Sequence, residues 1–86
     1  MAYKIVVEKA AGKSFNKLDE PAKKHIAEFL KKLGKTESPR SFGIAMKGNS
    51  GLWRYRVGDY RIIAHIKDNT ITITVTKIDH RREVYR

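Results

Sequence analysis

The fold of this chain is decided by residues 51–78, whose sequence is GLWRYRVGDYRIIAHIKDNTITITVTKI. Apolar and polar residues alternate through most of this stretch, and a period of two is typical of strands that are buried on one face. Gly58-Asp59 and Asp68-Asn69 are residue types that favour two-residue hairpin turns. The stretch therefore predicts an antiparallel meander with strands at residues 52–57, 60–67 and 70–78.

The two turns fix the pairing of these strands. The first turn places Tyr55 opposite Ile62, and the second places Ala64 opposite Ile73, with Ile66 opposite Ile71, Ile62 opposite Val75 and His65 opposite Thr72. Each turn is assigned independently, yet both put the same residues on one face of the sheet. That face is the predicted core side, and it consists of Trp53, Tyr55, Val57, Tyr60, Ile62, Ala64, Ile66, Ile71, Ile73 and Val75.

The first half of the chain predicts one strand, at residues 3–7, and two helices. The first helix begins near Glu8. The second is capped by Asp19, carries Pro21 in its first turn and ends at Gly34 in the left-handed conformation. Its predicted buried stripe is Ala22, Ile26, Phe29, Leu30 and Leu33. Residues 35–50 are expected to form a loop.

These elements predict a single α+β domain over residues 1–86. Its two-helix hairpin packs on one face of a mainly antiparallel sheet of about four strands, in the order β-α-α-β-β-β.

The other face of the predicted sheet carries arginine. Arg56 lies opposite Arg61, and Arg54 lies on the same face. The expected third-strand members of that face are Thr70, Thr72, Thr74 and Thr76, so we expect no carboxylate there. Like charges directly opposite in a sheet are destabilising, and this arrangement indicates a site for an anion such as phosphate. The alternative is a solvated face on which the arginines splay apart.

The composition narrows the possible functions. The 86 residues carry 19 Lys and Arg against 9 Asp and Glu, a formal net charge of +10, which favours an anionic partner. No apolar run is long enough to span a bilayer, and residues 1–7 lack the pattern of a signal peptide. We therefore expect a cytoplasmic protein that does not bind membranes. The absence of cysteine and the wide spacing of the three histidines predict no metal site.

The C-terminal residues 79–86 add further hydrogen-bond donors. If the chain continues beyond the third strand, Arg81 and Tyr85 join the arginine face. A tyrosine in this position can stack on a base or transfer a proton, although Tyr85 could instead close the edge of the core. His80 alone is a weak signal, because a single surface histidine usually has no such role.

Residues 51–63 and 80–85 resemble the RelE group of the RelE/ParE toxin superfamily. Lys17-Leu18-Asp19, Ser38-Pro39-Arg40 and Met46-Lys47-Gly48 match the same pattern in order, so the resemblance covers nearly the whole chain. Members are toxins of type II toxin–antitoxin modules, with a helical hairpin packed on an antiparallel sheet. The resemblance implies a ribosome-dependent mRNA endonuclease (an mRNA interferase) that cleaves codons in the ribosomal A site, inhibiting translation and arresting growth.

The resemblance also implies roles for individual residues. The family's chemistry attacks the scissile phosphate with the neighbouring 2′-hydroxyl, leaving a cyclic or 3′-phosphate and a 5′-hydroxyl. Arg61 and Arg81 match positions that hold the phosphate, and Tyr85 matches a tyrosine that orients the nucleotide or takes the 2′-proton. These three are the expected catalytic residues. The expected RNA- and phosphate-binding residues are Arg54, Arg56, Lys47, His80 and Arg82.

One departure from the family pattern affects the expected mechanism. Well-known members carry lysines on the central strand, where this chain has Arg54 and Arg56. Arginine is not deprotonated in proteins, so neither residue can act as a general base. The base is then Tyr85, His80, a ribosomal group or no specific group.

The expected partners are a cognate antitoxin protein and the ribosome with mRNA in its A site, and no cofactor is expected. Two alternatives remain open from the sequence. The chain could resemble the ParE branch, which shares the fold and inhibits DNA gyrase by binding, or it could be a non-catalytic basic module that binds RNA or the ribosome.

Overall fold

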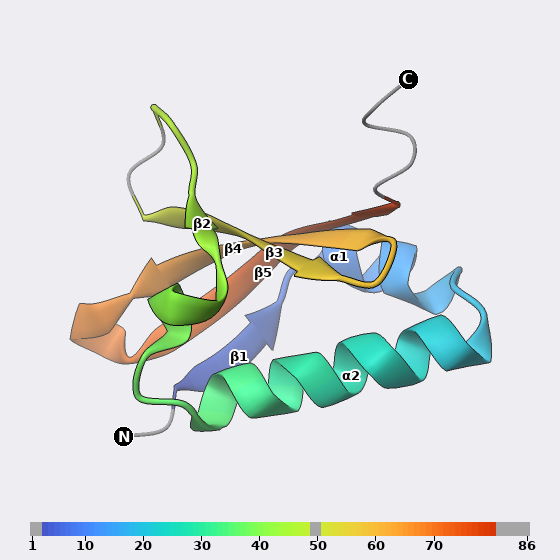
Figure 1. Ribbon diagram of the computed structural model, residues 1–86, viewed down its shortest axis with the longest axis horizontal. Coiled ribbons are helices and arrows are strands. Elements are labelled where there is room, and N and C mark those ends of the chain that lie inside the picture. Colours follow the sequence, from blue (N-terminus) through green and yellow to red (C-terminus); the bar gives the residue numbers. More distant parts are fainter. Residues whose placement is uncertain (1–2, 49–50, 81–86) are drawn as a thin grey trace.

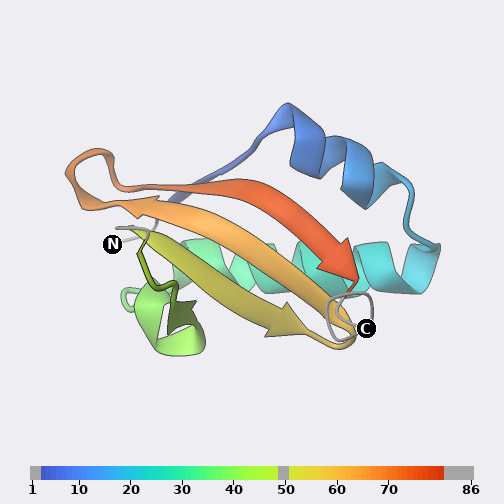
Figure 2. The same cartoon turned by 90° about the horizontal axis from the view of Figure 1, so that it is seen from above.

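In the computed structural model, which describes residues 3–48 and 51–80, two helices cover one side of a five-stranded sheet (Figures 1 and 2). The sheet order is β1-β5-β4-β3-β2, and only the β1–β5 pair is parallel. The elements are β1 (Lys4–Val7), α1 (Lys9–Asn16), α2 (Glu20–Lys35), η1 (Pro39–Phe42), β2 (Ile44–Ala45), β3 (Leu52–Val57), β4 (Tyr60–Lys67), η2 (Asp68–Thr70) and β5 (Thr72–His80). The predicted α+β class and the two helices on one face are confirmed.

The described helices include none that is both long and apolar enough to cross a membrane.

The hairpin between β3 and β4 forms as predicted. Val57 pairs with Tyr60, so Gly58 and Asp59 make the two-residue turn. Gly58 has a φ of 57°, a left-handed conformation that glycine adopts without a steric penalty. The pairing of Tyr55 with Ile62 places both side chains in the core, where each is at most 1% exposed.

The predicted turn between β4 and β5 is wrong in length. The connection is the 3-10 turn η2, followed by Ile71 in the left-handed conformation with a φ of 50°. Ile66 therefore pairs with Ile73 rather than Ile71, and His65 pairs with Thr74 rather than Thr72. The register moves by two residues, so Ile66, Ile73 and Val75 still face the core, because successive strand residues alternate between faces. Ile71, which was predicted on the core side, lies in the connection and does not belong to the core cluster.

A β-bulge changes this alternation further along β5. Ala64 pairs with Val75 but Ile63 pairs with Lys77, so Thr76 is an extra residue on β5. The longer turn and the bulge together move the partner of Ile62 by three residues, from Val75 to Ile78, and Ile78 enters the core at 4% exposure. A bulge places two residues of one strand against one of its partner. Beyond Thr76, every side chain of β5 therefore lies on the face opposite to the one that strict alternation predicts.

Helix α2 starts as predicted and ends differently. The Asp19 carboxylate accepts a hydrogen bond from the Ala22 amide at 3.0 Å, which caps the helix. Gly34 lies inside α2 and lacks the predicted left-handed conformation. It is instead required by close packing, because a Cβ there would lie 3.0 Å from Ile5 Cγ1 and 3.2 Å from the Tyr3 carbonyl oxygen.

The helices and the inner face of the sheet enclose one apolar core. Helix α1 packs against β5, and α2 packs against β1 and β3. Ile26 and Leu33 of the predicted stripe have no exposed surface, while Phe29 and Leu30 pack at its border. The fully or almost fully buried members of the cluster are Ala11, Ile26, Leu33, Tyr55, Ile62, Ala64, Ile66, Ile73, Val75 and Ile78.

The region predicted as a loop contains the 3-10 turn η1 and the short strand β2. β2 pairs with β3 and is the fifth strand of the sheet, where about four strands were predicted. Two buried contacts hold this segment on the sheet. The Tyr55 hydroxyl donates to the Pro39 carbonyl oxygen at 2.8 Å, and Gly43 lies so close to Tyr55 that a Cβ would come within 2.7 Å of its ring.

Candidate nucleic-acid interface

The predicted arginines share the outer face of the sheet. Arg56 pairs directly with Arg61 across β3 and β4, and Arg54 pairs with Ile63 on the same face. Both helices pack on the opposite face, so no described helix covers this side of the sheet (Figure 2). The period of two in the strands brings the three guanidinium-bearing residues to one exposed surface, as the sequence predicted. We call this surface, with Lys77 and Asp79 of β5, the outer face.

The prediction that the outer face carries no carboxylate is wrong. Asp79 pairs with Arg61 across β4 and β5, and Arg61 Nη2 donates to Asp79 Oδ2 at 3.1 Å. Lys77 Nζ lies 3.5 Å from the same oxygen. The bulge at Thr76 is the cause, because it turns Asp79 toward the arginines. Without the bulge, alternation along β5 would direct Asp79 toward the core side.

Arg61 is more enclosed than a surface arginine. Its side chain is 21% exposed, and that of Asp79 is 29% exposed. Arg61 Nε is buried and makes no hydrogen bond within the part of the chain that the structure describes. Buried polar groups are nearly always paired, and an unpaired donor costs free energy. The Arg61 guanidinium therefore keeps an unused capacity to donate.

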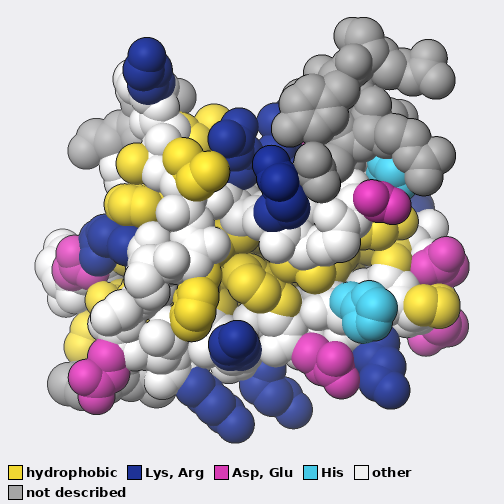
Figure 3. Space-filling view, viewed as in Figure 1, with side chains coloured by type: hydrophobic (Ala, Val, Ile, Leu, Met, Phe, Trp, Pro, Cys, Tyr) yellow, Lys and Arg dark blue, Asp and Glu magenta, His cyan; other side chains and the backbone are white. Residues whose placement is uncertain are grey.

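Arg54 and Arg56 make no ion pair with any carboxylate in residues 3–48 and 51–80. Arg56 is exposed and Arg54 half-buried. The outer face, as defined above, thus carries the positive charges of three arginines and Lys77 and the negative charge of Asp79. Figure 3 shows basic side chains over the sheet and a second group along α2, separated by a band of apolar side chains. An anion bound to the outer face would relieve the repulsion between Arg56 and Arg61.

The other predicted binding residues lie at separate places. Lys47 is exposed on the segment after β2. His80 is the last residue of β5 and packs edge-on against Tyr60, with ring centroids 4.9 Å apart. Arg81, Arg82 and Tyr85 lie outside the described residues.

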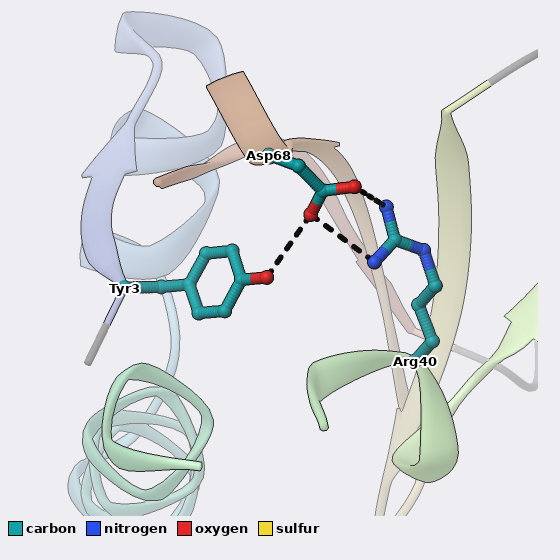
Figure 4. A network of polar contacts seen from close by, with 3 residues as sticks. All are labelled: Tyr3, Arg40 and Asp68. Carbon is teal, nitrogen blue, oxygen red and sulfur yellow. Dashed lines mark hydrogen bonds and ion pairs between the residues drawn. The ribbon is translucent and has the colours of Figure 1, made fainter. Parts of the chain in front are cut away.

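Arg40 forms a polar network that was not anticipated (Figure 4). Its Nη1 and Nη2 donate to the two carboxylate oxygens of Asp68 at 3.2 and 2.8 Å, and the Tyr3 hydroxyl donates to Asp68 Oδ1 at 3.0 Å. The hydrogen bonds from Arg40 and Tyr3 hold the pKa of Asp68 below its ordinary value. Because the partners are 28 and 65 residues apart in the chain, no local pattern signals this network.

Arg40 therefore serves to join η1 to the start of η2, with its guanidinium 5.8 Å from the centre of the Trp53 ring. Tyr55 likewise has a structural role and is not a candidate for proton transfer. Burial raises the pKa of Tyr55 to about 12, which makes its hydroxyl a weaker acid than that of an ordinary tyrosine. Residues 3–48 and 51–80 contain no cluster of three His, Cys, Asp or Glu that could hold a metal ion.

A family model described as the ParE toxin of type II toxin–antitoxin systems, parDE, matches residues 5–85. Among curated proteins, no sequence matches the chain significantly.

Several solved toxin structures share this fold. The toxin–antitoxin complex RelBE2 from Mycobacterium tuberculosis matches with a TM-score of 0.84 at 24% identity, over 94% of this chain and all of that one (100%). The archaeal RelE–RelB complex from Pyrococcus horikoshii matches with a TM-score of 0.80 at 27% identity, covering 94% and 97%. The isolated Escherichia coli RelE toxin matches with a TM-score of 0.79 at 18% identity, covering 98% and 92%.

Proposed function

This chain belongs to the ParE toxin family of type II toxin–antitoxin systems, and we propose that it is a ribosome-dependent endoribonuclease of the RelE type. In this proposal it cleaves mRNA in the ribosomal A site and so inhibits translation. The observation that carries the proposal is the outer face, where Arg54, Arg56 and Arg61 converge and Asp79 is the one carboxylate among the strand residues described there. A protein that only binds gyrase has no need of a convergent phosphate site.

The spacing of the arginines suits one phosphodiester. Neighbouring strands lie about 5 Å apart, so the guanidinium groups of Arg56 and Arg61 can both reach the oxygens of one phosphate. Arginine forms charge-assisted, often bidentate hydrogen bonds with phosphate. Because these residues lie on a sheet rather than on a loop, their backbone is held in place before the RNA binds.

The proposed reaction transfers the phosphate within the RNA. The 2′-oxygen attacks phosphorus, the bond from phosphorus to the 5′-oxygen breaks, and the products are a 2′,3′-cyclic phosphate and a 5′-hydroxyl. The proton lost by the 2′-hydroxyl passes to a base, and a proton is delivered to the leaving 5′-oxygen. Arg61 stabilises the additional negative charge on the phosphorane. The interaction between Arg61 and the phosphate oxygens is therefore stronger in the transition state than in the bound substrate.

The proton transfers fall to residues other than the central-strand arginines. Arg54 and Arg56 supply charge and hydrogen bonds only, because a guanidinium keeps its proton. We propose Tyr85 as the residue that handles the 2′-proton and Arg81 as a second phosphate ligand, both beyond the described residues. Lys47, His80 and Arg82 extend the RNA-binding surface in this proposal.

A toxin of a type II toxin–antitoxin system has a protein partner, its antitoxin. Complexes of RelE with RelB are among the solved structures of this fold, and we propose that a cognate antitoxin neutralises this chain in the cytoplasm. An acidic or amphipathic segment that covers the outer face would occupy the arginines that otherwise meet RNA. Co-expression with the product of an adjacent reading frame should then restore growth. Toxicity that no neighbouring product relieves would count against such a partner.

The nuclease proposal is tested in a translating extract by mapping new mRNA 5′ ends. Wild-type protein should cut within A-site codons, and Arg61→Ala should reduce cleavage about 10²–10³-fold, as loss of one oxyanion ligand does. Lys24→Ala, which removes one exposed charge from α2, is the matched control and should cleave normally. Intact mRNA with loss of gyrase supercoiling would instead identify the ParE branch, and inhibition with neither product would identify a binding module.

A further inference from the structure

Asp79 is the unexpected residue of the outer face. It contacts two cations, since Arg61 Nη2 lies 3.1 Å and Lys77 Nζ 3.5 Å from the same Oδ2 atom. Its side chain is only 29% exposed, so the ion pair is shielded from solvent more than a typical surface ion pair is. The bulge at Thr76 is what brings this carboxylate to the outer face.

The contact with Asp79 uses a small part of the hydrogen-bonding capacity of Arg61. Only Nη2 donates to Asp79, and within the described residues neither Nη1 nor the buried Nε makes a hydrogen bond. A guanidinium presents N–H groups along two edges of a plane, so one carboxylate oxygen leaves donors for another acceptor. A phosphate can therefore bind Arg61 while Asp79 stays in contact.

Arg61 would be difficult to hold in place without this carboxylate. Arg56 stands directly across the sheet from it, and the two like charges repel each other. Repulsion favours rotamers that carry the Arg61 head away from the centre of the face. Repulsion alone selects no single rotamer, and the bond to Asp79, on the strand on the other side of Arg61, fixes one of them.

We propose that Asp79 is a positioning residue, which fixes the Arg61 guanidinium in the orientation that receives the scissile phosphate. It acts through Arg61 and does not touch the RNA. The inference rests on the proposed nuclease function for its kinetic consequence, but its structural content concerns the Arg61 side chain alone. The opposing possibility is that Asp79 competes with phosphate for Arg61.

Kinetics of A-site cleavage separate the two roles. Asp79→Ala should lower kcat about tenfold to 100-fold, the scale of a misplaced catalytic contact, with KM unchanged or lower because the face gains net positive charge. Asp79→Asn keeps an oxygen acceptor and should recover most of kcat. In an Arg61→Ala background, Asp79→Ala should cause no further loss, since coupled residues are not additive.

A measurement on the free protein tests the positioning without any cleavage. The Arg61 Nε–H resonance in a nitrogen–proton correlation spectrum should be sharp in the wild type, and it should broaden or disappear in Asp79→Ala and persist in Asp79→Asn. Glu28→Ala makes the same change in charge on exposed α2 and should leave the Arg61 signal and kcat unchanged.

The outcomes are distinguishable. A raised kcat in Asp79→Ala would show that the carboxylate competes with phosphate, and an unchanged Arg61 signal would show that it does not order the guanidinium; either result overturns the inference. If the wild type cleaves no mRNA while the Arg61 signal still depends on Asp79, the nuclease proposal fails and the positioning of Arg61 stands.

Discussion

The hydrogen bond between Tyr55 and Pro39 offers a direct test of how the segment from η1 to β2 is held on the sheet. Tyr55 is 1% exposed, and its hydroxyl donates to the Pro39 carbonyl oxygen at 2.8 Å. Tyr55→Phe keeps the ring in the core and removes only this donor. The change therefore isolates one buried contact between two parts of the chain that are 16 residues apart.

The expected loss follows from the contact. A buried neutral hydrogen bond contributes about 0.5–1.5 kcal/mol net, and stranding part of its acceptor capacity adds to the cost. We expect Tyr55→Phe to lower the free energy of unfolding by about 1–2 kcal/mol. For a domain of this size, each kcal/mol corresponds to a fall in Tm of roughly 4–8 °C.

Urea unfolding followed by circular dichroism measures the effect, with the midpoint moving and the m-value constant. Tyr60→Phe is the matched control. Tyr60 is half-buried and its hydroxyl makes no hydrogen bond within the described residues, so its loss should change stability by less than about 0.5 kcal/mol. Equal stability of Tyr55→Phe and the wild type would refute the claim that this bond fastens the segment.

Three further predictions concern packing and pH. Gly43→Ala should destabilise the fold by about 1–3 kcal/mol in urea, because the new Cβ would lie 2.7 Å from Tyr55 Cε1 and 2.9 Å from the Arg54 carbonyl oxygen; a stability equal to wild type would contradict the close approach. Burial raises the pKa of Tyr55 from 10.0 to about 12, so the native state retains a proton that the unfolded chain loses, and stability should fall as the pH rises from about 10 to about 12. Tyr55→Phe should remove that part of the alkaline decline in chemical unfolding. The lowered pKa of Asp68 changes stability in the opposite direction with pH, because its stabilising contribution is present above the ordinary pKa of about 4 and is lost at lower pH. Asp68→Asn should therefore make Tm depend less on pH in the acidic range. An unchanged acidic dependence would show that the contacts with Arg40 and Tyr3 do not stabilise the native state.

The bulge at Thr76 has a functional consequence. It reverses the faces of the last residues of β5, which moves Ile78 into the core and Asp79 to the outer face. Bulges often redirect a side chain beside a functional site. Here the redirected side chain pairs with Arg61, the residue to which the proposed reaction assigns the phosphate. The same local irregularity thus completes the core and supplies the carboxylate of the outer face.

Features that depend on neighbours in sequence were predictable. The cap of α2 was predicted from Asp19 and Pro21, because the capping oxygen and the amide it binds are three residues apart. The turn at Gly58-Asp59 was likewise local. Features that depend on distant segments were not predictable: the parallel pairing of β1 with β5, the strand β2, and the contact of Gly34 with Ile5 all join residues whose proximity no local pattern encodes.

The pattern of residues 52–67 is enough to place Arg54, Arg56 and Arg61 together on one side of a sheet and most of the apolar residues on the other, because side chains alternate with a period of two and one turn fixes their pairing. How those charges are balanced depends on the three-dimensional packing of β5 against β4. Whether Asp79 meets Arg61 depends on an extra residue in β5 and on a longer turn than two residues, and both are set by packing across the whole sheet rather than by the preferences of adjacent residues.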